Sequence, residues 1–193
     1  MSYGLLALRV VLGLILAAHG AQKLFGWFDG PGLRGIAGMF GGHLRFRAPL
    51  LMALVGGLAE FGGGLLLASG LLTPLAALAI AAMMINAAVT VHWANGFWAT
   101  KGGYEYNLLI LATAAAIAAT GPGRYSLDAL IGWADDISGV WWGVGVLAVS
   151  AVLSALVLAF GRHAPAVGAA GAGTADRADG EDAPAGQAAA TTR

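Results

Sequence analysis

The sequence contains no cysteine, and only 10% of its 193 residues are charged. Without cysteine the chain holds no disulfide, no thiolate metal site and no CxxC redox pair, so it performs no thiol chemistry of its own. Soluble domains carry about 25% charged residues, so this composition disfavours a soluble fold. Ten basic residues balance ten acidic ones, and no basic cluster extends beyond residues 45–47. A nucleic-acid partner is therefore not expected.

The sequence is instead rich in long apolar segments. Hydrophobic residues make up 59% of the chain, and the mean hydropathy is +0.77. Five segments approach the roughly 20 apolar residues that a bilayer-spanning helix needs, namely 5–24, 50–72, 75–94, 104–120 and 140–160. We therefore expect an all-α integral membrane protein in direct contact with the lipid bilayer. The first segment lacks the basic start of a signal peptide, so we expect it to remain as a helix.

The connections between these segments differ in kind. The stretch LLTPL predicts a tight helical hairpin, with Thr73 as the N-cap and Pro74 in the first turn of the next helix. Residues 26–49 are too polar and glycine-rich to span, and the spacing of Leu33, Ile36 and Phe40 favours a short interfacial or re-entrant helix, with a surface loop as the alternative. From residue 162 onward the composition predicts a disordered tail.

The charges in the connections predict an orientation in the plasma membrane. One side would carry Lys23, Arg34, Arg45, Arg47, Lys101 and Arg162. The other would carry Arg9, Arg124, Asp128, Asp135 and Asp136. Since lysine and arginine are retained in cytoplasmic loops, we expect a multi-pass protein with its N-terminus outside and its C-terminal tail in the cytoplasm.

Glu60 is an ionisable residue inside a predicted span. It lies about 15 Å along the second helix, where a charge costs at least about 2.5 kcal/mol, so it should face protein. Gly56 and Gly64 lie one turn before and after it and let another helix approach closely. In an antiparallel hairpin Asn86 reaches the same depth, so we expect a Glu60–Asn86 hydrogen bond. The contact is either interhelical packing or part of a proton or ligand site.

Polar side chains from three helices are expected to meet at one membrane depth. In AAHGAQKLFGW, His19, Gln22 and Lys23 form a stripe on one helix face. His92 and Asn95 of the third predicted helix and Tyr104 and Glu105 of the fourth lie at that level. With the group around Glu60 included, the full candidate set consists of His19, Gln22, Lys23, Glu60, Asn86, Thr90, His92, Asn95, Tyr104 and Glu105. The alternatives are a snorkelling lysine, an aromatic belt and structural histidines.

Catalytic and metal motifs are missing from the sequence. It has no Walker A, dinucleotide-binding or GxSxG motif, so no catalytic residue is assigned. Two histidines and a glutamate could ligate a metal, but the tight spacing of a motif such as HExxH is absent, so no metal site is expected.

Three stretches carry a family resemblance: LRVVLGLILAAHGAQKLFGWF, GGLAEFGGGLLLASGLLTPLAAL and GGYEYNLLILATAAAIAATGPGRYSLD. They closely resemble the DoxX family of small bacterial membrane proteins. The resemblance implies a four-helix membrane core in 1–130, to which an extra transmembrane helix in 131–161 and the tail in 162–193 are added. It also implies a redox setting, because relatives include a small subunit of thiosulfate:quinone oxidoreductase and a membrane component of an oxidoreductase complex grouped with superoxide dismutase and a sulfurtransferase. Glu60 and Glu105 match family positions.

The function expected from these observations is that of a subunit or anchor of a membrane-associated oxidoreductase assembly. It would not be catalytic alone, would contact a quinone through His19, His92 and Glu105, and would have soluble redox enzymes as partners. Two alternatives remain open: a permeation protein for protons or small molecules that uses Glu60, and a structural scaffold. Glycine-lined helix faces also allow a homo-oligomer.

Overall fold

The structure is a computed structural model that describes residues 2–163, and this part of the chain is helical with no named β-strand. Its long helices are α1 (Ser2–Phe25), α3 (Pro49–Ser69), α4 (Thr73–Ala87), α5 (Glu105–Thr120) and α7 (Val140–Gly161). A π-helical turn η1 (Ala88–His92) and a 3-10 turn η2 (Trp93–Asn95) prolong α4, so its span runs over Thr73–Asn95. Within residues 2–163, four helices are long and apolar enough to cross a membrane, and α5 is shorter at 16 residues. The predicted all-α membrane bundle is confirmed.

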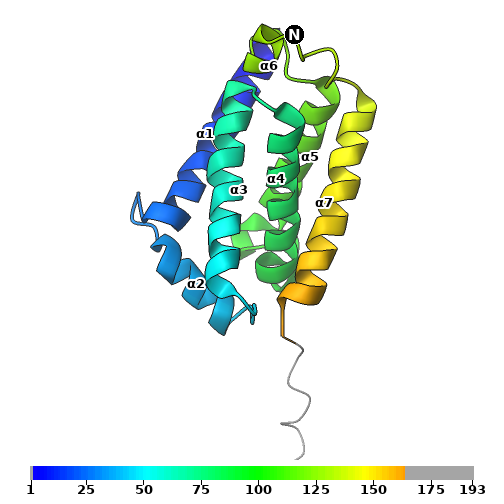
Figure 1. The fold of residues 1–193 in the computed structure, drawn as a ribbon. Coiled ribbons are helices and arrows are strands. Elements are labelled where there is room, and N and C mark those ends of the chain that lie inside the picture. Colours follow the sequence, from blue (N-terminus) through cyan, green and yellow to red (C-terminus); the bar gives the residue numbers. More distant parts are fainter. Residues whose placement is uncertain (1, 164–193) are drawn as a thin grey trace, which may run out of the picture. The chain divides into compact units, whose positions relative to one another are not determined.

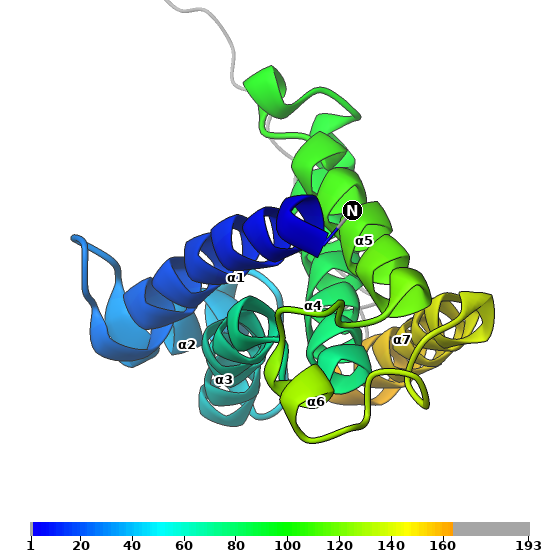
Figure 2. The ribbon, with the colours of Figure 1, turned by 90° about the horizontal axis from the view of Figure 1, so that it is seen from above.

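The helices of the described part pack side by side in a fixed order. Helix α1 packs on α3, α3 on α4, and α4 on both α5 and α7, which also contact each other. Figures 1 and 2 show α1 and α7 on opposite sides of α4. The C-terminal helix, expected as an addition to a four-helix core, is thus packed directly against two helices of that core.

Small residues line the helix contacts. Gly64 of α3 lies against the backbone of Gly13 and Ala17 of α1, and Gly20 of α1 lies against the backbone of Phe61. A side chain at Gly20 would overlap that backbone, so glycine is what allows α1 and α3 to approach so closely. The small residues at this contact therefore serve packing within the chain. The buried core is aliphatic and includes Leu16, Leu67, Ala76, Ala77, Ile80, Ala81, Ile117 and Ala118.

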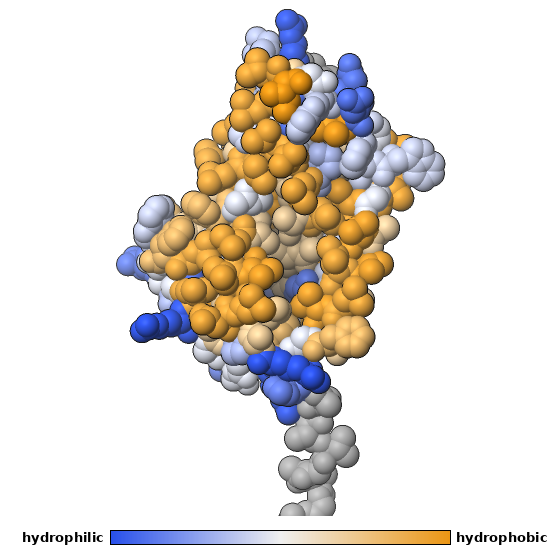
Figure 3. Space-filling view, viewed as in Figure 1, coloured by the Kyte–Doolittle hydropathy of each residue, from blue (hydrophilic) through white to orange (hydrophobic). Residues whose placement is uncertain are grey.

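The outer surface of the bundle matches a bilayer. Exposed leucine and valine side chains cover the outward faces of the long helices, and Figure 3 shows an apolar band with hydrophilic residues gathered above and below it. An apolar surface of this extent marks contact with lipid or protein. The bundle therefore presents the surface that a multi-pass membrane protein requires.

In the described part of the chain, most of the basic residues lie at one end of the bundle. Residues 26–49 contain α2 (Gly32–Gly42), which packs on α3 and buries Ile36, so the predicted short helix is present. The α4–α5 connection contains η3 (Ala99–Lys101) and lies at the same end as α2 and the end of α7 (Figure 1). We call it the basic end, after Arg34, Arg45, Arg47, Lys101 and Arg162.

The predicted hairpin between α3 and α4 is present, but the capping role predicted for Thr73 is wrong. Helix α3 ends at Ser69, and Gly70 follows with φ of 65°, a left-handed conformation that favours glycine. Leu72 precedes α4 and supplies no side-chain cap. The cap comes from Asp128, far along the chain, which lies in the short helix α6 (Leu127–Leu130). The predicted disordered tail lies outside the described residues, apart from Arg162 and His163.

Candidate functional site

The central polar contact of the bundle is an ion pair between α1 and α3. The ammonium Nζ of Lys23 lies 2.5 Å from Oε1 of Glu60. The side chain of Glu60 is 5% exposed and that of Lys23 is 24% exposed. The second carboxylate oxygen, Oε2 of Glu60, is buried and has no hydrogen-bond partner among the described residues. The site therefore combines a held cation, a buried anion and one free acceptor.

Glycines position this ion pair. A Cβ at Gly57 would overlap the side chain of Leu24, which follows Lys23 on α1, and Gly64 contacts the α1 backbone one turn beyond Glu60. Because these positions carry no side chain, α1 comes close enough for a lysine in its last turn to reach a carboxylate about 16 Å along α3. Glu60 faces a partner helix, as its small neighbours indicated.

The expected Glu60–Asn86 hydrogen bond is not formed, because both residues are engaged elsewhere. The amide of Asn86 donates to the carbonyl of Ala82 (2.8 Å) and to Oγ of Ser154 on α7 (2.9 Å). Thr90 donates to the carbonyl of Asn86. Asn86 therefore joins α4 to α7, and Glu60 turns to the other side of α3. Sequence reasoning missed Ser154, although serines four residues apart in an apolar segment are a signal for helix contacts.

The other candidate residues mostly hold the connections of the basic end. Nδ1 of His92 and the amide of Asn95 both lie within hydrogen-bond distance of the carbonyl of Gly102, at 2.7 and 3.1 Å. Glu105 accepts from the backbone N–H of Ala99 (2.9 Å). These bonds fold the α4–α5 connection back on itself and use the polar groups locally.

The three polar residues on one face of α1, His19, Gln22 and Lys23, lie in three different environments. Lys23 pairs with Glu60, Gln22 donates to the carbonyl of Phe28 (3.2 Å), and His19 is exposed. Tyr104 stacks on Trp93, with ring centroids 5.2 Å apart. Within residues 2–163, no hydrogen bond or ion pair links His19 to the α4–α5 connection. The candidate residues therefore include two separate groups. Lys23 and Glu60 make the ion pair, and His92 and Asn95 gather around the carbonyl of Gly102.

A second cluster of buried charged residues lies at the end of the bundle opposite the basic end. The sequence had suggested that its residues, Arg9 and Asp128, belong to the connections between helices. Arg9 and Asp128 are 1% and 0% exposed. Asp128 accepts from the backbone N–H of Leu72 (2.8 Å) and from the N–H and hydroxyl of Thr73 (2.9 and 2.7 Å). Arg9 donates to the carbonyl of Tyr125 (2.5 Å) and has Asp128 as its charged neighbour. This cluster fastens α1, the α3–α4 turn and the α6 segment together.

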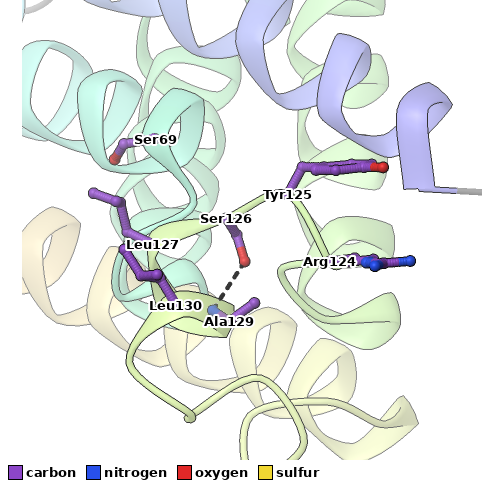
Figure 4. Close-up of a pocket in the computed structure, with 7 residues that line it drawn as sticks. All are labelled: Ser69, Arg124, Tyr125, Ser126, Leu127, Ala129 and Leu130. Atoms are coloured by element: carbon purple, nitrogen blue, oxygen red, sulfur yellow. Dashed lines mark hydrogen bonds between the residues drawn. The ribbon is translucent and has the colours of Figure 1, made fainter.

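An open pocket of about 520 Å³ lies beside this cluster, lined by Ser69 and by residues 124–127, 129 and 130 (Figure 4). Oγ of Ser126 accepts from the N–H of Ala129 and caps α6. The hydroxyl of Tyr125 donates to that of Tyr3 (2.9 Å), and this bond, followed by desolvation, raises the pKa of Tyr125. Arg124, which is exposed, is the charged residue of the lining. The pocket borders a structural cluster and brings together no set of reactive groups.

Side chains that could ligate a metal ion do not gather in one place in the described part of the chain. Residues 2–163 contain no group of three or more histidine, cysteine, aspartate or glutamate side chains placed to hold a metal ion. The Lys23–Glu60 pair is therefore the arrangement in this part of the chain with the clearest capacity for chemistry. An ammonium donates to a carbonyl or anion, and a free carboxylate oxygen accepts from a hydroxyl and takes up a proton.

Comparison with known proteins places the chain in a family. Residues 4–93 match the DoxX family, and residues 49–141 match the family described as TQO small subunit DoxD. A Bacillus subtilis (strain 168) protein named "Putative oxidoreductase CatD" is 32% identical over 128 residues, which cover 66% of this chain and 87% of that protein. No solved structure matches the chain significantly. On the matched sequence and the helical membrane bundle together, the chain belongs to the DoxX family.

Proposed function

We propose that the chain is the membrane subunit of an oxidoreductase assembly and that its Lys23–Glu60 pair contacts a quinone. The match to a family described as a TQO small subunit and the relative named as an oxidoreductase support the assembly. The chain has no cysteine and no catalytic motif, which supports a subunit that works beside a catalytic partner. In this proposal a soluble redox enzyme docks on the membrane and supplies the electrons.

The free Oε2 of Glu60 carries the proposal for a quinone. A buried acceptor without a donor costs about 1–3 kcal/mol, so the site favours a ligand that brings a donor. The residues fit a quinone, because its carbonyl oxygens accept from an ammonium and the hydroxyls of its reduced form donate to a carboxylate. Its apolar ring and tail suit the surrounding leucine-rich helices.

The two residues take different roles toward such a ligand. The side chain of Lys23 is 24% exposed, so a ligand reaches the ion pair from the side of Lys23. The ammonium of Lys23 then orients a carbonyl oxygen of the quinone. Glu60, a carboxylate while it is paired with Lys23, takes up a proton at Oε2 from the reduced ligand and returns it. A bound quinone would carry electrons together with protons between the assembly and the bilayer.

Quinone retention tests this proposal. We expect the chain, purified from its own membranes in mild detergent, to retain a stoichiometric amount of quinone, measured by solvent extraction and chromatography, together with a redox enzyme identified by mass spectrometry. Glu60→Gln should lose most of the quinone, because an amide accepts no proton and weakens the bond to Lys23.

Glu105→Gln is the matched control, since Glu105 uses its carboxylate to hold the backbone of Ala99. It should retain quinone at the parental level. Recovery of neither quinone nor a redox enzyme with the parent chain would contradict the proposal, as would a loss of quinone in Glu105→Gln but not in Glu60→Gln. Proton flux in liposomes that depends on Glu60 would support a permeation protein instead.

We also propose that the basic end faces the cytoplasm and the N-terminus the outside, on the strength of the lysine and arginine distribution. The chain has no cysteine. In the variants Arg34→Cys and Asp135→Cys, the introduced cysteine is therefore the one thiol of the chain that a reagent can label. In intact cells, a thiol reagent that does not cross membranes should label the cysteine of Asp135→Cys and spare that of Arg34→Cys. The reverse labelling pattern would invert the orientation.

A further inference from the structure

The loop before α3 and the end of α7 are joined at the basic end by backbone pairing. Phe46 and Arg162 form an isolated antiparallel bridge. The N–H of Arg47 donates to the carbonyl of Gly161 at 2.8 Å. The pairing brings basic residues from distant parts of the sequence to one place and holds their backbones there.

The same pairing orients two guanidinium groups. Nε of Arg47 donates to the carbonyl of Arg162 (3.2 Å), and Nε of Arg162 donates to the carbonyl of Leu44 (2.9 Å). Within residues 2–163, the Nη atoms of both arginines have neither a hydrogen-bond partner nor an ion-pair partner. Arg45, next to the bridge, is exposed. We call Arg45, Arg47 and Arg162 the arginine clasp.

The clasp lies at the level where a membrane's headgroups would be. Arg47 stands two residues before the span Pro49–Ser69, and Arg162 directly follows the span Val140–Gly161. Two exposed tryptophans lie at the same end, Trp93 in the last turn of the span Thr73–Asn95 and Trp98 in the α4–α5 connection. Tryptophan is enriched at membrane–water interfaces, so exposed tryptophans at this end support a headgroup layer beside the clasp.

We propose that the arginine clasp binds the phosphate headgroup of an anionic phospholipid. A guanidinium presents paired N–H donors that match the geometry of a phosphate, and basic residues beside membrane helices attract anionic lipids. Because the Nε atoms are fixed by the protein, the two Nη atoms of Arg47 and of Arg162 are already directed and little side-chain entropy is lost on binding. Their place at the span ends favours a lipid over a soluble acidic protein. This proposal stands independently of the quinone contact.

Native mass spectrometry of the full chain in a neutral detergent tests the clasp, with phosphatidylglycerol and phosphatidylcholine titrated separately. We expect phosphatidylglycerol to bind more tightly, and the double variant Arg47→Gln with Arg162→Gln to weaken it about thirtyfold while phosphatidylcholine binding stays unchanged. Arg34→Gln is the matched control, because Arg34 is exposed on α2 at the same end but lies outside the clasp. It should leave the difference between the two lipids intact.

Arg45→Gly keeps the test decisive if the double variant fails to fold. Arg45 has φ of 57°, a conformation that glycine adopts freely, so this variant should fold and bind phosphatidylglycerol about fivefold more weakly. Equal affinity for the two lipids would overturn the proposal, as would an effect of Arg34→Gln as large as that of the clasp variants. Full competition by inorganic phosphate would also overturn it, in favour of a site for free anions. Capture of an acidic protein by a chain that does not discriminate between the lipids would point to protein docking.

Discussion

Lys23→Met is expected to lower the free energy of unfolding by about 3 kcal/mol, because it leaves the carboxylate of Glu60 buried without its cation. Removing one partner of a buried ion pair costs about 3–5 kcal/mol, and the partial exposure of Lys23 places the value at the lower end. Methionine retains the length of the side chain, so the effect reports the lost charge. Unfolding in mixed detergent micelles, followed by circular dichroism, measures it.

Two further variants distinguish the loss of the ion pair from the general effect of replacing a lysine. Lys101→Met removes an exposed lysine that forms no ion pair in the described part of the chain, and it should change stability by less than about 0.5 kcal/mol. Lys23→Met combined with Glu60→Gln should cost less than Lys23→Met alone, because no uncompensated charge remains buried. If Lys23→Met costs no more than Lys101→Met, the ion pair has no energetic role.

Asp128→Ala is expected to destabilise the bundle by about 3–5 kcal/mol. The change removes the acceptor of three hydrogen bonds at the start of α4 and leaves Arg9 buried without its acidic neighbour. Asp128→Asn keeps one oxygen and should cost less. Thermal unfolding in detergent checks both, and faster hydrogen exchange in the α3–α4 turn should accompany the loss.

Asp135→Asn provides the control for the Asp128 variants, since Asp135 is exposed in the same connection. It should leave the unfolding temperature unchanged. A small effect of Asp128→Ala, similar to that of Asp135→Asn, would mean that the cluster around Arg9 does not hold α1 to the rest of the bundle.

The helices were predictable from the sequence because their signals are local. Apolar length located all five long helices to within a few residues, as with 140–160 for α7 (Val140–Gly161), although α5 is shorter than the other four. The glycines around Glu60 correctly indicated that it faces another helix. Which helix it faces was not predictable. Gly57 and Gly64 indicate that some helix packs closely against α3, but not which one, and the antiparallel hairpin of α3 and α4 suggested α4 instead of α1.

The buried charges at the opposite end show a second limit. Arg9 and Asp128 were predicted among the charges of the connections on the outer side of the membrane, and each is almost fully buried. The position of Arg9 inside the first apolar segment was a usable signal, since a charge there needs a partner. The role of Asp128 as the cap of α4 depends on contacts 55 and 56 residues apart, and local sequence rules do not report contacts at that separation.

We propose that Glu60 is a carboxylate held by Lys23, with Oε2 free to bind a quinone. Infrared difference spectroscopy between the parent chain and Glu60→Gln, in lipid nanodiscs with and without added quinone, tests it most directly. We predict a band of an ionised carboxylate that is absent from Glu60→Gln and that shifts when quinone is added. A band of a protonated acid, or a carboxylate band that quinone leaves unmoved, would contradict the claim.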